Sequence, residues 1–269
     1  MAHRILLAAA AAALIAGPAA AGDVKNPLAD GPTWEDLRVD VAGEAELMDA
    51  AGLLELDAPY RAHDAATVPV ILRQLDPAAR ITAATVVVDE NPAPVVAEFG
   101  FSDAMAPLDF EMRVRVDQYS NVRVIAETEE GLHMTGRFVK ASGGCSAPAT
   151  RDPEVALKTM GEMKLRLFGE EPKMSTPRRE AQIMIRHPNY SGLQRDQITQ
   201  LFVPAHFIDH LEVWQGDDLL FTMEGGISVS ENPVFRFSYA DNGAAALTVK
   251  ATDTEGNSFE RVLPKSGGA

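Results

Sequence analysis

The chain has 269 residues, 46% of them hydrophobic, and its 39 acidic and 24 basic side chains give a formal net charge of −15. A surface this acidic repels phosphate backbones and anionic lipid headgroups, which argues against nucleic acid or a membrane surface as a partner. The roughly 250 residues that follow the N-terminal segment are enough for one large domain or two of ordinary size.

Residues 1–21 are typical of an export signal. Arg4 provides the positive start, residues 5–15 form an apolar run too short to span a bilayer, and Ala19–Ala21 provide a small-residue cleavage site. We therefore expect a mature chain that begins at Gly22 and is soluble in the bacterial periplasm. The alternative is that the segment is retained as an N-terminal anchor.

Residues 33–52 have helical rather than strand spacing. Thr33 is a suitable N-cap, and Trp34, Leu37 and Val41 fall on one helical face. This pattern predicts a short helix before the first strands.

From Leu53 onward, short apolar runs alternate with polar residues at a period of two. Asn91–Pro94 and Glu130–Gly131 are turns by composition. Closely spaced strands of this kind predict an antiparallel β-sandwich. The strands expected in this half are residues 81–88, 95–101, 110–116, 122–126 and 132–140.

The second half shows the same alternation of short apolar runs and polar residues as the first. Gln215–Asp218 has the composition of a hairpin turn, so a second sandwich is expected. Its strands are expected at residues 163–167, 181–186, 208–214, 219–224, 234–239, 245–252 and 258–263.

A connector separates the halves at residues 146–162. Asp152, Pro153 and Glu154 form a strong helix start and Gly161 a suitable stop, which predicts a short linker helix over residues 153–160. The stretch Ser142–Arg151 lacks apolar periodicity and is predicted to be mobile.

Cys145 is the only cysteine, so it has no partner for an intramolecular disulfide. Gly143 and Gly144 precede it, and glycines allow unusual backbone angles and close approach to another surface. A reachable thiol of this kind can form a persulfide or a mixed disulfide and release it by exchange. The small neighbouring residues argue against burial, and Lys140 is the nearest cation in sequence. The alternatives are an inert packed cysteine or an intermolecular disulfide.

The histidines present a possible metal site that we do not favour. His206 and His210 are four residues apart and His187 is nearby, but in a strand that spacing separates two side chains by about 13 Å. A structural or surface role is therefore preferred, and the same holds for His63. His133 precedes the cysteine segment and could act as its base, although a structural role is again preferred.

No self-contained catalytic apparatus is evident. The chain has no Gly-rich phosphate loop, serine nucleophile elbow or CxxC pair, and the methionines are interpreted as core residues. Trp34 and Trp214 are interpreted as packing anchors. We expect no cofactor and no metal.

The two halves resemble a known pair of proteins. The first is similar to SoxY, the sulfur-carrying subunit of SoxYZ, and the second to its partner SoxZ. The SoxY-like features are Ala58-Pro59, Val68-Pro69-Val70, Asn91-Pro92-Ala93-Pro94 and Gly143-Gly144-Cys145. The SoxZ-like features are His187-Pro188 with Gly192, Ala205-His206-Phe207-Ile208, Ser230-Glu231-Asn232-Pro233 and Asp253-Thr254-Glu255-Gly256.

The resemblance implies an all-β chain of two immunoglobulin-like sandwiches in tandem, which pack on each other. The SoxY-like domain would span residues 33–145 and the SoxZ-like domain residues 163–264. The cysteine of such proteins carries covalent sulfur intermediates on a glycine arm between periplasmic enzymes. The fused layout is similar to the SoxYZ-like carriers associated with quinoprotein dehydrogenases.

One departure from the family matters. The SoxY arm normally ends the chain as Gly-Gly-Cys-Gly-Gly, whereas Ser146-Ala147-Pro148 and a whole domain follow Cys145. A loop tethered at both ends enters a narrow enzyme tunnel less easily than a free end, which weakens the expectation of standard thiosulfate oxidation.

We therefore expect a non-enzymatic carrier that presents Cys145 to periplasmic redox enzymes, either Sox-type enzymes or a quinoprotein dehydrogenase system. The first alternative is a non-covalent docking module for such a dehydrogenase or a cytochrome, with Cys145 incidental. The second is a thiol-dependent oxidoreductase, which would turn over substrate in isolation.

Overall fold

The structure is a computed structural model, and it describes residues 26–29, 31–148, 153–169 and 178–265. The predicted export signal lies outside these residues, as do residues 149–152 of the stretch expected to be mobile. No helix in the described part of the chain is long and apolar enough to cross a membrane.

Strands dominate the described residues, with two α-helices and a single 3-10 turn. The helices are α1 (Thr33–Ala42) and α2 (Pro153–Lys158), and the 3-10 turn is η1 (Asp103–Met105). The strands of the first half are β1 (Leu47–Asp49), β2 (Leu54–Asp57), β3 (Val68–Gln74), β4 (Ala83–Val88), β5 (Val95–Phe101), β6 (Asp109–Val114), β7 (Ser120–Thr128) and β8 (Gly131–Val139). Those of the second half are β9 (Met163–Phe168), β10 (Arg178–Ile185), β11 (Ile208–Gln215), β12 (Asp218–Gly225), β13 (Val234–Ala240), β14 (Ala246–Asp253) and β15 (Ser258–Pro264).

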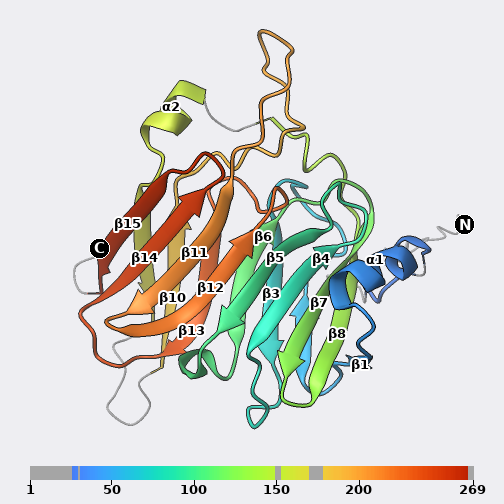
Figure 1. Cartoon of the computed structure of the whole chain (residues 1–269), viewed down its shortest axis with the longest axis vertical. Helices are drawn as coiled ribbons and strands as arrows, with labels where there is room; N and C mark the ends of the chain where they lie inside the picture. Colours follow the sequence, from blue (N-terminus) through green and yellow to red (C-terminus); the bar gives the residue numbers. More distant parts are fainter. Residues whose placement is uncertain (1–25, 30, 149–152, 170–177, 266–269) are drawn as a thin grey trace, which may run out of the picture.

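The strands form two sheets that face each other across one hydrophobic core (Figure 1). The larger sheet has the order β1-β8-β7-β4-β5-β12-β11-β14-β15, and the smaller one has the order β2-β3-β6-β13-β10-β9. The predicted class, an all-β chain of immunoglobulin-like sandwiches with short helices, is confirmed.

The two halves join edge to edge in both sheets, a feature that the sequence did not reveal. In the larger sheet β5 pairs antiparallel with β12, from Phe101 opposite Phe221 to Ala97 opposite Gly225. In the smaller sheet β6 pairs antiparallel with β13. We call these two pairings the seam. Each half would otherwise end in open strand edges with unpaired backbone groups, and the seam satisfies them.

Aromatic side chains fill the core beneath the seam. Phe110 of β6 is fully buried, and its ring centroid lies 5.0 Å from that of Phe99 and 5.4 Å from that of Phe101 in the first half. The same ring lies 5.2 Å from Phe221 and 6.2 Å from Phe235 in the second half. Offset and edge-on aromatic contacts add to the free energy of burial, so Phe110 couples the two halves.

The N-terminal helix is shorter than predicted. It ends at Ala42 because Gly43 takes a φ of +61°, and a short strand, β1, follows within residues 33–52. The cap position is occupied by Pro32 without a side-chain cap, so the assignment of Thr33 as N-cap is wrong. Trp34 is buried in a small cluster with Val87 of β4, which anchors α1 to the outer face of the larger sheet.

Replacement of Phe110 by alanine tests the shared core. Phe110→Ala is expected to lower the free energy of unfolding by about 3–5 kcal/mol, because it removes a fully buried ring and leaves a cavity between the halves. Urea unfolding followed by tryptophan fluorescence and circular dichroism would measure the loss.

The matched control is Phe202→Ala, because the Phe202 side chain is 58% exposed. Phe202→Ala should lower the free energy of unfolding by less than about 1 kcal/mol. If Phe110→Ala cost no more than the control, the seam would not depend on this core.

Candidate functional site

The segment Ser142–Pro148, here called the arm, follows β8 and crosses the end of the seam. Its cysteine is not exposed as expected: Cys145 is 0% exposed. The small neighbours of Cys145 do not prevent burial, because the side chains and loops that cover it come from both halves of the chain. The expectation that the thiol is displayed to solvent is therefore wrong.

The first half holds the arm through its backbone. The Gly143 amide donates to the carbonyl of Asp117 at 2.7 Å, and the Gly144 amide donates to the carbonyl of Val116 at 3.1 Å. The Cys145 amide donates to Oδ1 of Asp117 at 3.2 Å. Three successive backbone amides of the arm are thus bonded to one short segment after β6.

The second half holds the other side of the arm. The Ser191 hydroxyl donates to the carbonyl of Cys145, and Nε2 of Gln194 donates to the carbonyl of Ala147 at 2.9 Å. Both halves therefore bond to the backbone of residues 142–148, and the mobility expected of Ser142–Arg151 stays a prediction.

Both glycines fit the docked conformation. Gly143 has a φ of +78°, which disfavours a side chain. A Cβ on Gly144 would lie 2.1 Å from the carbonyl oxygen of Ala65 and 2.7 Å from the amide nitrogen of Val116. Only glycine allows this close approach, whereas the flexibility that we assigned to Gly143 and Gly144 stays a prediction.

Arg115 connects the arm to both halves. Its side chain is 1% exposed, and its guanidinium donates to the Gly144 carbonyl at 3.2 Å and to the Asn189 carbonyl at 3.1 Å. Its Nε is buried without a hydrogen-bond partner. Burial lowers the pKa of the guanidinium, an effect that the negative charges of Glu231 and Asp64 oppose.

Asn91 forms hydrogen bonds to both halves of the chain beside the arm. Its Nδ2 donates to the Arg115 carbonyl at 2.7 Å and to the Ser228 hydroxyl at 3.0 Å, and its Oδ1 accepts from the Asp117 amide at 2.8 Å. The Ser228 hydroxyl in turn donates to the Ala93 carbonyl at 2.9 Å. The Asn91–Pro94 turn is therefore a junction between the halves beside the arm.

The surroundings of Cys145 keep the thiol protonated. Burial raises the pKa of the Cys145 thiol to about 11, and the negative charge of Asp117 adds to the rise. The charge of Arg115 and a hydrogen bond with Ser228 lower the pKa of the thiol, but by less than burial and Asp117 raise it. Lys140, the cation expected from the sequence, instead has its Nζ 4.8 Å above the ring of Tyr60.

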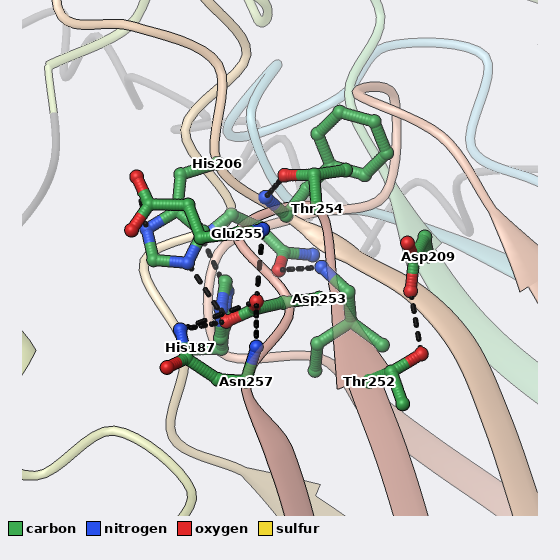
Figure 2. A network of polar contacts seen from close by, with 11 residues as sticks. His187, His206, Asp209, Thr252, Asp253, Thr254, Glu255 and Asn257 are labelled. Carbon is green, nitrogen blue, oxygen red and sulfur yellow. Dashed lines mark hydrogen bonds and ion pairs between the residues drawn. The ribbon is translucent and has the colours of Figure 1, made fainter.

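Two buried histidines, His187 and His206, converge on the carboxylate of Asp253 (Figure 2). Asp253 accepts hydrogen bonds from Nε2 of His206 at 2.8 Å, Nε2 of His187 at 3.3 Å and Nδ2 of Asn257 at 2.9 Å. Burial alone would raise the pKa of Asp253, but hydrogen bonds from Asn257 and His206 outweigh it and lower the pKa to about 2. Asp253 is therefore a charged acceptor at neutral pH.

His187, His206 and Asp253 place ligand-type atoms within 4.8 Å of one another, as a metal site would. The protonation pattern argues against one. The amide of Asn189 donates to Nδ1 of His187 at 3.1 Å, so that nitrogen carries no proton, and the ring proton lies on Nε2, which donates to Asp253. A metal on Nε2 would have to displace this proton, which leaves the network a structural role: it supports the loop that carries Asn189 and Ser191.

The other histidines lie apart from the arm. His210 is bonded to Glu224 on the neighbouring strand, with Nδ1 2.6 Å from Oε1, and does not share a site with His206. His133 lines a pocket with Asp49 and Glu130, and both its ring nitrogens are buried without hydrogen-bond partners. None of the contacts described for Cys145 comes from His133. His63 is exposed.

Arg115, Asp117, Ser191 and Ser228 were missed by the sequence analysis. Phe110, Met112 and Val114 mark the inward face of β6, and Val116 continues the same alternation beyond it, so Arg115 falls on the face that alternation assigns to solvent. It is buried only because the arm and the second half cover that face. No local signal in the sequence could have revealed this.

Each half of the chain matches a known protein family. Residues 38–145 match the family described as "Sulfur oxidation protein SoxY", and residues 171–264 match the one described as "Sulphur oxidation protein SoxZ". The chain is a SoxY domain followed by a SoxZ domain. The resemblance is confirmed, and the SoxY match ends at Cys145 itself.

Solved structures add little to this identification. The SoxY sulfur carrier protein from Chlorobium limicola f thiosulfatophilum is 25% identical over 40% of this chain and 94% of its own, with a TM-score of 0.34. A β-glycosidase from Bacteroides vulgatus is 8% identical over 79% of this chain and 24% of its own, with a TM-score of 0.25. Neither TM-score reaches 0.5. No curated protein matches the chain.

The histidine network of the SoxZ domain predicts a loss of stability in mild acid. Burial lowers the pKa of His187 below its ordinary value of about 6.5, so the unfolded chain takes up a proton that the folded chain does not. The contribution of neutral His187 to the free energy of unfolding is complete above about pH 6.5. Below that pH the free energy of unfolding falls by up to about 1.4 kcal/mol per pH unit. Urea unfolding between pH 7.5 and 5 would measure the slope.

His187→Gln should flatten this slope, whereas the exposed His63→Gln should leave it unchanged. Equal slopes in His187→Gln and the wild type would show that His187 is not held neutral by the fold.

Proposed function

We propose that the protein is a periplasmic covalent carrier that binds sulfur-containing intermediates on Cys145 and passes them between partner enzymes. The observation that carries the proposal is the position of Cys145, which is the last residue of the SoxY match and lies on a glycine arm at the seam with the SoxZ domain. Its export to the periplasm rests on the signal-like residues 1–21.

The chemistry of loading is thiol–disulfide exchange. The Cys145 thiolate attacks one sulfur of a donor S–S bond, a new bond forms between Sγ and that sulfur, and the donor's second sulfur leaves as a thiolate. The reaction needs no external oxidant, because one S–S bond is exchanged for another. Attack by a second thiolate on the adduct reverses it, which frees Cys145 and transfers the cargo.

The partners proposed for this exchange are periplasmic redox enzymes, either of the Sox type or of a quinoprotein dehydrogenase system. Both domains of the carrier are present in one chain and share their sheets, so no separate SoxZ subunit is needed. The enzymes would supply the redox chemistry, and the isolated protein should turn over neither thiosulfate, sulfide nor glutathione adducts.

The burial of Cys145 favours one alternative function. In that alternative the protein docks non-covalently to a quinoprotein dehydrogenase or a cytochrome, and the thiol is incidental.

Replacement of Cys145 by serine separates the two functions. Cys145→Ser should abolish the activity of the host pathway while it leaves the fold intact, because serine is nearly isosteric but forms no S–S bond. The measurement is substrate consumption by cells that carry the variant on the chromosome.

Ser142→Ala is the matched control, because Ser142 is exposed on the same arm. It should retain wild-type consumption. Unchanged consumption in Cys145→Ser would exclude the carrier function and leave the docking function.

A further inference from the structure

The arm is closed in the structure, and a carrier cannot work in that state. Cys145 is fully buried, and exchange with a donor requires a thiolate that another sulfur can reach in line. Because domains precede and follow the arm, it can open only by lifting as a loop. Opening must break the contacts that cross from the arm to both domains.

We infer that Arg115 and Ser191, here called the latch, hold the arm closed and that Cys145 reacts only after the latch opens. The inference rests on the proposed function for the reason why the arm must open. The closed arm itself is a property of the isolated chain. Arg115 and Ser191 are therefore positioning residues, which act on the chemistry through the arm.

Arg115 suits this role because it bonds to the arm and to the SoxZ domain at once. Its guanidinium donates to Gly144 of the arm and to Asn189 of the loop behind it. Both acceptors are neutral carbonyls, and the buried Nε has no hydrogen-bond partner. A buried cation with an unsatisfied donor is costly, and opening the arm would hydrate it. The two hydrogen bonds of Arg115 therefore stabilise the closed arm, whereas hydration of its Nε favours the open arm. These opposing effects keep the free-energy difference between the closed and open states small.

Ser191 adds the contribution of the SoxZ domain. Its hydroxyl donates to the carbonyl of Cys145 itself, and its backbone amide donates to Oε1 of Gln194 at 3.3 Å. Gln194 in turn bonds to Ala147 of the arm. The loop that carries Ser191 rests on the buried His187–Asp253 contact, so the latch is built on a rigid base.

Closure also suppresses the reactivity of the thiol. The charged groups that act on Cys145 are Asp117, which raises its pKa, and Arg115, which lowers it; Glu231 and Asp64 act on Arg115. A rise in the pKa of Cys145 from 9.0 to about 11 lowers the thiolate fraction at neutral pH about a hundredfold. Burial and protonation together protect the empty carrier from adventitious oxidation.

Alkylation kinetics of the purified full-length protein test the latch without any partner enzyme. Cys145 is the only cysteine, so the mass added by iodoacetamide reports on this thiol alone. At pH 8 the folded wild type should react at least about a hundredfold more slowly than the protein in 8 M urea, a concentration chosen to unfold it.

Arg115→Met and Ser191→Ala should each speed alkylation about tenfold, because each removes one buried hydrogen bond to the arm. The control is Arg113→Met, because Arg113 is exposed on β6, two residues before Arg115, and its side chain does not bond to the arm in the described structure. The two possible roles of Arg115 predict opposite signs. If Arg115 only lowered the pKa of the thiol, its loss would slow alkylation, whereas loss of a latch residue speeds it.

The pH profile gives a second readout. In the closed wild type the rate should keep rising above pH 9, because the thiol ionises only near pH 11, and in the latch variants it should level off at a lower pH than in the wild type. Urea unfolding would show that each variant is folded at the pH of the assay. If Arg115→Met did not fold, Ser191→Ala would decide the question alone.

The inference is overturned if folded wild type reacts as fast as the unfolded chain, or if a folded latch variant reacts no faster than Arg113→Met. Failure of the carrier proposal would give a different result from failure of the latch inference. In that case Cys145→Ser would leave the host pathway intact while the alkylation rates still revealed a closed arm.

Discussion

The pairing of the two halves along both sheets is the constraint on which the rest of the structure depends. β5 with β12 and β6 with β13 convert two small sandwiches into one, and Phe110 lies where their cores meet. The end of this seam is where Asn91 bonds to Ser228 and where the arm is held. A site composed of residues from both domains can exist only because the domains are fixed relative to each other by backbone hydrogen bonds.

The covalent link between the domains gives the arm its particular character. In a separate SoxY subunit the resemblance implies a free carboxyl-terminal arm, whereas here the SoxZ domain follows and supplies Ser191 to the carbonyl of Cys145. Fusion thus places the partner domain permanently beside the thiol. The cost of ordering the arm is lower when both its ends are anchored, which favours the closed state.

Much of the fold follows from local pattern. The turn at Asn91–Pro94 and the alternation after it located β5 at its observed bounds, and the hairpin turn Gln215–Asp218 joined the correct strands. The helix prediction failed beyond Ala42 because Gly43 ends the helix, and the three residues of β1 are too few to show a period. Cys145 and its glycines were identified as the candidate site because their chemistry is visible in sequence.

The burial of that site could not be predicted, because it arises from contacts between residues far apart in the chain. Asn91 and Ser228 are separated by 137 residues, and Arg115 and Asn189 by 74. These contacts build the junction at which the thiol of Cys145 is buried, and we propose that this thiol is the carrier group. Intact-mass spectrometry of the protein purified from its native host without reductant tests this most directly. The account predicts a sulfur-containing mass addition that maps to Cys145 in at least one growth condition, and an unmodified thiol in every condition would contradict it.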